Sequence, residues 1–141
     1  MVELLKQILW SYIVLTYKYQ NIHRNVTWPI FLGWHAKMQE HYEYAFDAQD
    51  DVAEQLRQLW EVIDTMPWEL CSKSVIKHLD KMPDLQSTVK IVVEDHNSMA
   101  SLIKTAMLKA DSDREYWVLD MLTQLYRRHN KQRWLVESII K

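Results

Sequence analysis

The chain has 141 residues, a length that suits one domain, and 48% of them are hydrophobic, enough for a buried core. One glycine and three prolines exclude a fold of many short strands joined by tight turns, which depend on these residues. A formal charge of −2 gives no compositional support for nucleic-acid binding. The single cysteine excludes an internal disulfide. With no signal-peptide pattern and no long apolar run, we expect a cytoplasmic protein without a membrane span.

Two long amphipathic helices are predicted in the first half of the chain. The first runs from about Val2 to Val26, where apolar residues recur every three or four positions. Pro29 suits the opening position of a second helix, because the N–H that proline lacks would have no partner there. This second helix is predicted from about Ile30 to Asp64.

The second half predicts one short helix and two long ones. The short helix, Leu70 to Leu79, is expected in the connection after the second long helix. A third long helix is predicted from about Asp84 to Lys109, and a fourth from about Asp113 to near the C-terminus. Ser112 and Glu115 have the spacing of a capping box at the start of the fourth. The whole chain is therefore predicted to form one all-α domain, a four-helix bundle with a long connection between helices two and three.

Paired polar residues on the predicted second helix suggest a metal site that needs two chains. No Glu-x-x-His motif occurs, so a di-iron site inside one bundle is not expected. His35 and Gln39 are four residues apart, as are Asp50 and Glu54, so each pair lies on one helix face. Roughly 20 Å separates the two pairs along the helix. In an antiparallel copy related by a two-fold axis, His35 would face Glu54 and Gln39 would face Asp50.

That axis would pass between Tyr44 and Ala45, and the small Ala45 would allow close approach. The dimer would have two equivalent sites, which His23 could join from the first helix. Imidazole and carboxylate ligands suit divalent iron, manganese or zinc. The competing interpretation is that the acidic pair forms an ordinary solvated face. Four further histidines have no partner at ligand spacing and are expected to be packed or surface residues: His41, His78, His96 and His129.

Three motifs are spaced along the chain. The first is His23-Arg24-Asn25-Val26-Thr27-Trp28-Pro29-Ile30-Phe31, followed by His35. The second is Asp50-Asp51-Val52-Ala53-Glu54. The third comprises Asp120-Met121-Leu122-Thr123 and Lys131-Gln132-Arg133-Trp134. In type and spacing these motifs resemble the pattern of the Dps family of mini-ferritins, and the resemblance covers nearly the whole chain.

The resemblance implies that residues 1–141 form a ferritin-like bundle that assembles through two-fold dimers into a hollow dodecamer. It implies oxidation of ferrous iron by hydrogen peroxide or dioxygen at ferroxidase centres between subunits, storage of ferric mineral, and protection against oxidative damage. His23 and His35 of one subunit, with Asp50 and Glu54 of the other, would be the catalytic iron ligands. Gln39 would complete the metal site, in which zinc or manganese are alternative metals.

Two residues depart from the family pattern. Gln39 stands where the family usually has aspartate, and an amide carries no charge and bridges two metal ions poorly. Arg24 stands where the family has tryptophan, and an arginine disfavours a neighbouring cation unless it points into solvent. The alternative function is therefore a Dps-like shell with a weakened or non-ferroxidase metal site.

The resemblance also concerns iron entry and DNA. It implies acidic pores for iron, with Asp111, Asp113 and Asp120 as candidates near the start of the fourth helix. For Asp111 and Asp113 the alternative is a favourable interaction with the dipole at a helix N-terminus. Strong DNA binding is not expected, because Lys6 is the only basic residue among the first 17.

Overall fold

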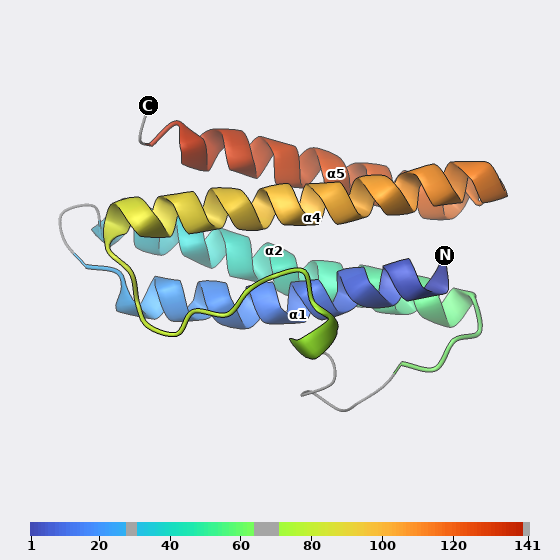
Figure 1. The fold of residues 1–141 in the computed structure, drawn as a ribbon, viewed down its shortest axis with the longest axis horizontal. Helices are drawn as coiled ribbons and strands as arrows, with labels where there is room; N and C mark the ends of the chain where they lie inside the picture. Colours follow the sequence, from blue (N-terminus) through green and yellow to red (C-terminus); the bar gives the residue numbers. More distant parts are fainter. Residues whose placement is uncertain (28–30, 64–70, 140–141) are drawn as a thin grey trace.

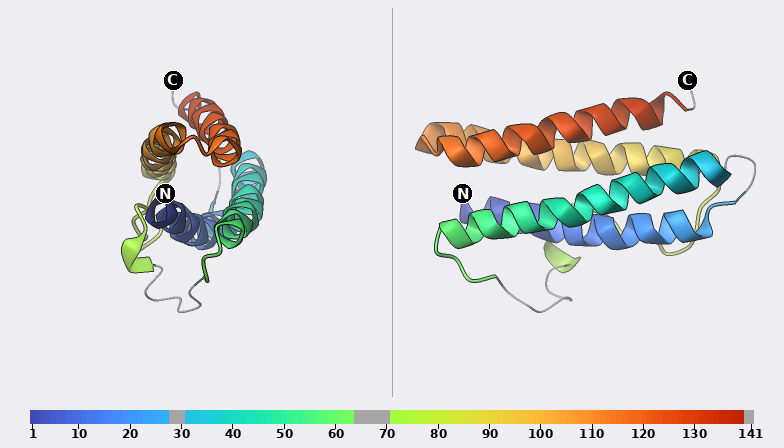
Figure 2. Two further views of the ribbon diagram at one scale, coloured as in Figure 1. Left: turned by 90° about the vertical axis from the view of Figure 1, so that its right-hand side faces the viewer. Right: turned by 180° about the vertical axis from the view of Figure 1, so that it is seen from behind.

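The computed structural model describes residues 1–27, 31–63 and 71–139. Four long helices account for most of them: α1 (Val2–Asn25), α2 (Phe31–Gln58), α4 (Leu85–Asp113) and α5 (Tyr116–Glu137). Helix α1 runs antiparallel to α2, and α4 antiparallel to α5 (Figure 1). Viewed nearly end-on, the four helices surround one common interior (Figure 2). The predicted all-α four-helix bundle is confirmed.

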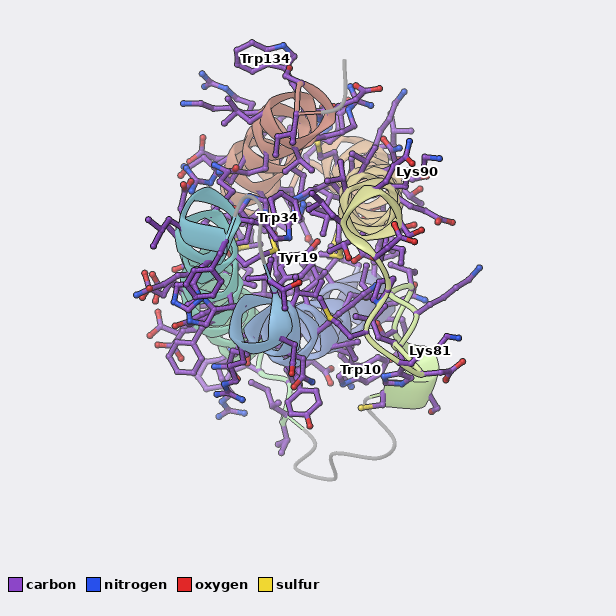
Figure 3. All side chains as sticks on the ribbon, turned by 90° about the vertical axis from the view of Figure 1, so that its left-hand side faces the viewer. Trp10, Tyr19, Trp34, Lys81, Lys90 and Trp134 are labelled. Atoms are coloured by element: carbon purple, nitrogen blue, oxygen red, sulfur yellow. The ribbon has the colours of Figure 1, made fainter. Side chains whose placement is uncertain are left out.

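Apolar side chains from all four helices fill this interior. Tyr19 and Trp34 point inward, whereas Trp134 points outward from α5 (Figure 3). A buried ion pair also ties α1 to α4, with Lys18 Nζ 2.7 Å from Asp95 Oδ1. Breaking such a pair is costly, because one charge is left buried without a partner. Within the described ranges, no helix has the length and apolar character needed to cross a bilayer.

Two helices end on a left-handed residue that is not glycine. After α2, Trp60 has φ 65°, and its N–H donates to the carbonyl of Arg57 while the next N–H donates to that of Leu56. After α4, Arg114 has φ 60° and the same pair of bonds forms, one of them to Ala110. These Schellman motifs satisfy carbonyls that a helix end leaves free. The second helix therefore ends at Gln58, and its predicted extension is wrong over residues 59–63; Asp64 lies outside the described residues.

The junction between α4 and α5 also differs from the prediction. Helix α4 starts as predicted, with Asp84 Oδ1 accepting the Ser87 N–H at 2.8 Å. It then continues past the predicted end to Asp113, so Ser112 lies inside α4. Glu115 precedes α5 without a side-chain capping bond, and the predicted capping box is wrong.

Residues 71–84, the later part of the connection between α2 and α4, run along the outside of α1 (Figure 1). Only residues 71–73 of its described part are helical, so the predicted short helix does not continue to Leu79. Ser74 explains the break, because its Oγ accepts the Ile76 N–H at 2.9 Å and so competes with the helical hydrogen bond. The Ser11 hydroxyl accepts the Val75 N–H at 3.1 Å and holds the connection on α1. Leu70 and Pro29 lie outside the described residues.

Candidate metal centre

Two histidines from neighbouring helices face each other where α1 ends and α2 begins. The His23 Nδ1 lies 2.8 Å from the backbone carbonyl oxygen of His35, and the His35 Nδ1 lies 2.8 Å from that of His23. Their rings stack with centroids 3.6 Å apart. The rings of Tyr42 and His23 form a T-shaped pair, and the ring centroids of Phe31 and His35 lie 4.9 Å apart. We call these two residues the histidine pair.

The hydrogen bonds of the histidine pair determine which nitrogen is free. A carbonyl oxygen only accepts, so each Nδ1 must carry the hydrogen and each Nε2 keeps a lone pair. Among the described residues, neither Nε2 has a hydrogen-bond partner. Metal-binding histidines commonly have this arrangement, in which a carbonyl fixes Nδ1–H and orients the ring while the other nitrogen binds the metal. The pair therefore presents two oriented donor atoms.

The other candidate ligands lie elsewhere on α2. Helical spacing places six residues on one side of this helix, which we call the outer face of α2: His35, Gln39, Glu43, Phe46, Asp50 and Glu54. Asp50 and Glu54 are exposed, and Asp50 lies 15 residues after His35, or about 22 Å along the helix. No group of three or more metal-binding side chains occurs in the described part of one chain. A single chain thus separates its histidines from its carboxylates.

Gln39 has a carboxylate neighbour, Glu43, which the sequence interpretation placed elsewhere on the helix. Its Nε2 donates a hydrogen bond to Glu43 Oε1 at 2.8 Å, one turn along the helix. The amide oxygen of Gln39 therefore points away from Glu43. A carboxylate consequently lies beside the position where the family pattern has aspartate. The i, i+4 spacing from Gln39 was the signal that could have identified Glu43.

The structure corrects the expectation about the helix crossing. Ala45 is 2% exposed and packs in the core of its own chain, so it is not available for close approach by a second chain. Phe46 is 63% exposed and lies on the outer face of α2. The difference arises because successive helical residues point about 100° apart, which turns Ala45 inward.

The aspartates considered as pore residues lie near the turn between α4 and α5. Asp111 and Asp113 belong to the last turn of α4 rather than to the start of the next helix. The alternative role considered for them, at a helix N-terminus, is therefore wrong, because a C-terminus favours positive charge. Asp113 pairs with Lys109 at 2.5 Å. Asp120 lies on α5 and accepts a hydrogen bond from Gln124 at 3.1 Å.

Three of the histidines left unassigned by the sequence meet inside the bundle. His96 Nε2 lies 3.2 Å from His41 Nδ1, and His96 Nδ1 lies 2.9 Å from His129 Nδ1. Hydrogen bonds extend this group at both ends, to the Tyr12 hydroxyl and to the Gln132 amide. Gln132 in turn bonds to a carboxylate on α2. We call the six residues the core histidine network: Tyr12, His129, His96, His41, Gln132 and Glu40.

Burial controls the charge states in this network. It lowers the pKa of His41 to about 4 and that of His129 to about 3, and it lowers the pKa of His96 well below its ordinary value. Burial likewise raises the pKa of Tyr12 well above its ordinary value. For Glu40, partial burial acts to raise the pKa, but hydrogen bonds from Lys37 and Gln132 bring it below the ordinary value. The histidines are therefore neutral and Glu40 is ionised at neutral pH.

Comparisons with known proteins give one family model, similar sequences and similar folds. The family model described as Ferritin-like domain matches residues 2–141. The chain is 27% identical to an uncharacterised low temperature-induced protein of Nostoc sp., over 99% of this chain and 79% of that protein. It is also 27% identical to the DNA protection during starvation protein of Brevibacillus brevis, over 98% of this chain and 93% of that protein. The crystal structure of Dps from Staphylococcus aureus superposes with a TM-score of 0.96 at 22% identity, covering 99% of this chain and 94% of that one.

Proposed function

This chain belongs to the ferritin-like domain family, and on that premise we propose that it is a mini-ferritin. Its substrates are ferrous iron and an oxidant, either hydrogen peroxide or dioxygen. Its product is ferric iron, stored as mineral inside a hollow dodecamer built from two-fold dimers. By consuming iron and peroxide together it protects the cell against oxidative damage.

The observation that carries this proposal is the arrangement of the histidine pair. His23 and His35 each have Nδ1–H bound to a backbone carbonyl, which leaves two oriented Nε2 atoms without a hydrogen-bond partner among the described residues. A histidine held only for packing has no need of this arrangement in both members of a pair. Two imidazoles leave several coordination positions of an iron ion open, which suits binding of a substrate metal and an oxidant.

A second copy of the chain supplies the carboxylates in this proposal. An antiparallel partner across a two-fold axis brings the partner's outer face of α2 against this one, with Asp50 and Glu54 approaching the histidine pair. Exposed Phe46 near the centre of that face provides apolar surface for the contact. The carboxylates add negative charge, which favours ferric over ferrous iron and so assists the loss of an electron. Zinc or manganese would bind the same donor set.

Gln39 favours a second candidate function, a shell whose metal site oxidises iron slowly or not at all. Its amide contributes an oxygen donor but no charge. One contact offsets this loss. Glu43 accepts the Gln39 N–H, which orients the amide oxygen and places a carboxylate nearby. Arg24 is exposed, so its charge is screened by solvent.

Iron oxidation separates these two functions. Ferrous iron and peroxide are added anaerobically to the purified oligomer, and ferric absorbance is followed in the near ultraviolet. The mini-ferritin proposal expects oxidation well above the protein-free rate, and a rate equal to the protein-free control contradicts it. Gln39→Asp restores the missing carboxylate and should raise the rate severalfold. An unchanged rate would show that Gln39 does not limit the centre.

Two further expectations accompany the proposal. Asp120 is exposed on α5 and is our candidate for a residue lining the route of iron entry, since Asp113 is already paired with Lys109. Asp120→Asn should slow mineral formation more than it slows oxidation of the first iron ions. The negative net charge disfavours strong DNA binding, so the chain should not retard duplex DNA in a gel at physiological salt.

A further inference from the structure

The core histidine network has a single possible order of donors and acceptors. The Glu40 carboxylate only accepts, so Gln132 directs its Nε2 toward Glu40 at 2.8 Å and its Oε1 toward His41 at 2.9 Å. The amide oxygen also only accepts, so His41 carries hydrogen on Nε2 and a lone pair on Nδ1. Glu40 therefore sets the direction of the hydrogen bonds that follow it into the core.

The donors and acceptors of the remaining hydrogen bonds, from His96 to Tyr12, are fixed in the same way. His96 donates from Nε2 to His41, which leaves its Nδ1 as an acceptor at 2.9 Å from His129 Nδ1. His129 donates from that Nδ1 and accepts at Nε2 from the Tyr12 hydroxyl, 2.8 Å away. Every ring nitrogen is used, and each imidazole is neutral. Since no nitrogen is left over, these three histidines are not a metal site in this arrangement.

This order lets a proton leave Tyr12 without any ring turning. If Tyr12 passes its proton to His129 Nε2, His129 can release its Nδ1 proton to His96 Nδ1. Both hydrogen bonds then persist in the reverse direction, and His96 still donates to His41. The positive charge has moved one ring away from Tyr12, while every buried polar atom of the network keeps a partner.

Acid dissociation does not drive this transfer, because burial raises the pKa of Tyr12. Loss of an electron from Tyr12 drives the proton transfer to His129, because a phenol that has lost one electron is a far stronger acid. The proton then needs an acceptor already in hydrogen-bond contact, and His129 Nε2 is that acceptor. The half-buried Tyr44 of α2 is an aromatic neighbour of Tyr12, with the two ring centroids 6.3 Å apart in a T-shaped arrangement. The guanidinium of Arg128 on α5 lies over the Tyr44 ring, 4.8 Å from its centroid.

We propose that Tyr12 is a redox-active tyrosine, with His129 and His96 as the acceptors of its proton. The oxidant is the hydroxyl radical formed when ferrous iron meets peroxide, so its physiological source rests on the proposed function. The electron leaves the Tyr12 phenol and reduces the hydroxyl radical to hydroxide, which takes a proton from solvent to become water. The phenolic proton enters the imidazoles, and a neutral phenoxyl radical remains. A ferrous ion later returns one electron and becomes ferric while the proton moves back to Tyr12.

Photochemical oxidation of the iron-free oligomer tests this proposal separately from ferroxidase activity. A ruthenium polypyridyl complex with a sacrificial acceptor supplies the one-electron oxidant, and electron paramagnetic resonance detects the radical. The wild-type protein should give a long-lived phenoxyl signal. Tyr12→Phe should remove that signal, and the matched control Tyr17→Phe, at an exposed tyrosine on the same helix, should leave it. A long-lived signal that survives Tyr12→Phe overturns the proposal.

The role of the histidines has its own readout. His129→Leu keeps Tyr12 but removes its proton acceptor, and the phenoxyl radical should form roughly 100-fold more slowly. Formation at the wild-type rate contradicts the proposal. If either variant fails to assemble, the wild-type radical still provides a test: double-resonance spectra should show a hydrogen bond from an imidazole N–H to the phenoxyl oxygen of Tyr12. A phenoxyl oxygen hydrogen-bonded only to water would overturn the assignment.

A second arm replaces the ruthenium oxidant by ferrous iron and peroxide. Appearance of the Tyr12 radical in both arms supports the proposal and the physiological oxidant together. A radical in the photochemical arm alone supports the redox role of Tyr12 and removes iron and peroxide as its source. Normal iron oxidation with no Tyr12 radical in either arm contradicts the redox role and leaves the ferroxidase function standing.

Discussion

The histidine pair and the core histidine network contain the same residue type in opposite arrangements. In the pair, each ring gives one nitrogen to a backbone carbonyl and keeps the other free. In the network, both nitrogens of each ring are used in side-chain hydrogen bonds. The histidine pair therefore has ring nitrogens available to a metal ion, whereas all ring nitrogens of the network form hydrogen bonds within it. Hydrogen-bond partners, more than residue type, determine which histidines have a nitrogen available for a metal ion.

The largest expected effect of this difference is a loss of stability in acid. The network histidines have lowered pKa values in the folded protein, so the unfolded chain binds their protons first as pH falls below about 6.5. Stability is then lost between pH 6 and pH 4, by about 4 kcal/mol per pH unit for three histidines. Burial raises the pKa of Asp95 to about 6, so the folded protein gains one proton there and offsets about 1.4 kcal/mol per unit.

Chemical denaturation at fixed protein concentration measures this slope. The free energy of unfolding should fall by about 3 kcal/mol per pH unit between pH 6 and pH 4. His129→Gln should reduce this slope by about 1.4 kcal/mol per pH unit. A free energy that stays level from pH 7 to pH 5 would show that the network does not hold its histidines neutral.

Removing a member of the histidine pair should act on catalysis instead. His35→Ala deletes one metal donor, and the initial rate of ferrous oxidation should fall roughly 100-fold. His78→Ala, at an exposed histidine in the connection before α4, is the matched control and should leave the rate unchanged. Equal effects of the two substitutions would remove the distinction between the histidine pair and an ordinary surface histidine.

A smaller effect is expected where the network meets Glu40. Gln132→Met leaves the His41 Nε2–H buried without an acceptor and should cost about 1–3 kcal/mol of unfolding free energy. Gln124→Met, on the same helix but exposed, should change stability by less than about 0.5 kcal/mol. Denaturation midpoints of both variants at pH 8 provide the comparison, and similar midpoints would speak against a satisfied network.

The smallest expected effect concerns Glu43. Glu43→Gln keeps a hydrogen bond to Gln39 but removes the charge, and ferrous oxidation should slow by roughly fivefold. Asp47→Asn, at an exposed acid on the same helix, should slow it far less. An unchanged rate in Glu43→Gln would mean that its carboxylate does not compensate for Gln39.

The helices were predictable from sequence because their apolar residues repeat at helical spacing, whereas some boundaries were not. Residues Asp111 to Glu115 suit either the end of one helix or the start of the next. In the structure, Arg114 adopts a left-handed conformation that ends the first helix at this point. Its side-chain type does not predict that conformation. The end of α2 depends on Trp60 in the same way.

Part of the candidate site was predictable from sequence, and the core histidine network was not. Motif and spacing could predict that His23 and His35 lie close together, because the two residues are only 12 apart in sequence, near the end of α1 and the start of α2. The network escaped detection because His41, His96 and His129 come from three helices and meet only when the bundle packs. One signal was present, since His41 falls at helical spacing from the buried Trp34 and Met38 and therefore faces the core.

The central claim is that iron binds between two chains, and subunit complementation tests it most directly. One variant lacks the histidines (His23→Ala with His35→Ala) and the other lacks the carboxylates (Asp50→Asn with Glu54→Gln). Each alone should be inactive. Mixed two-fold dimers contain one complete site of two, so coassembly should restore about half the wild-type rate per mixed dimer. Mixed oligomers as inactive as the separate variants would contradict a centre shared between subunits.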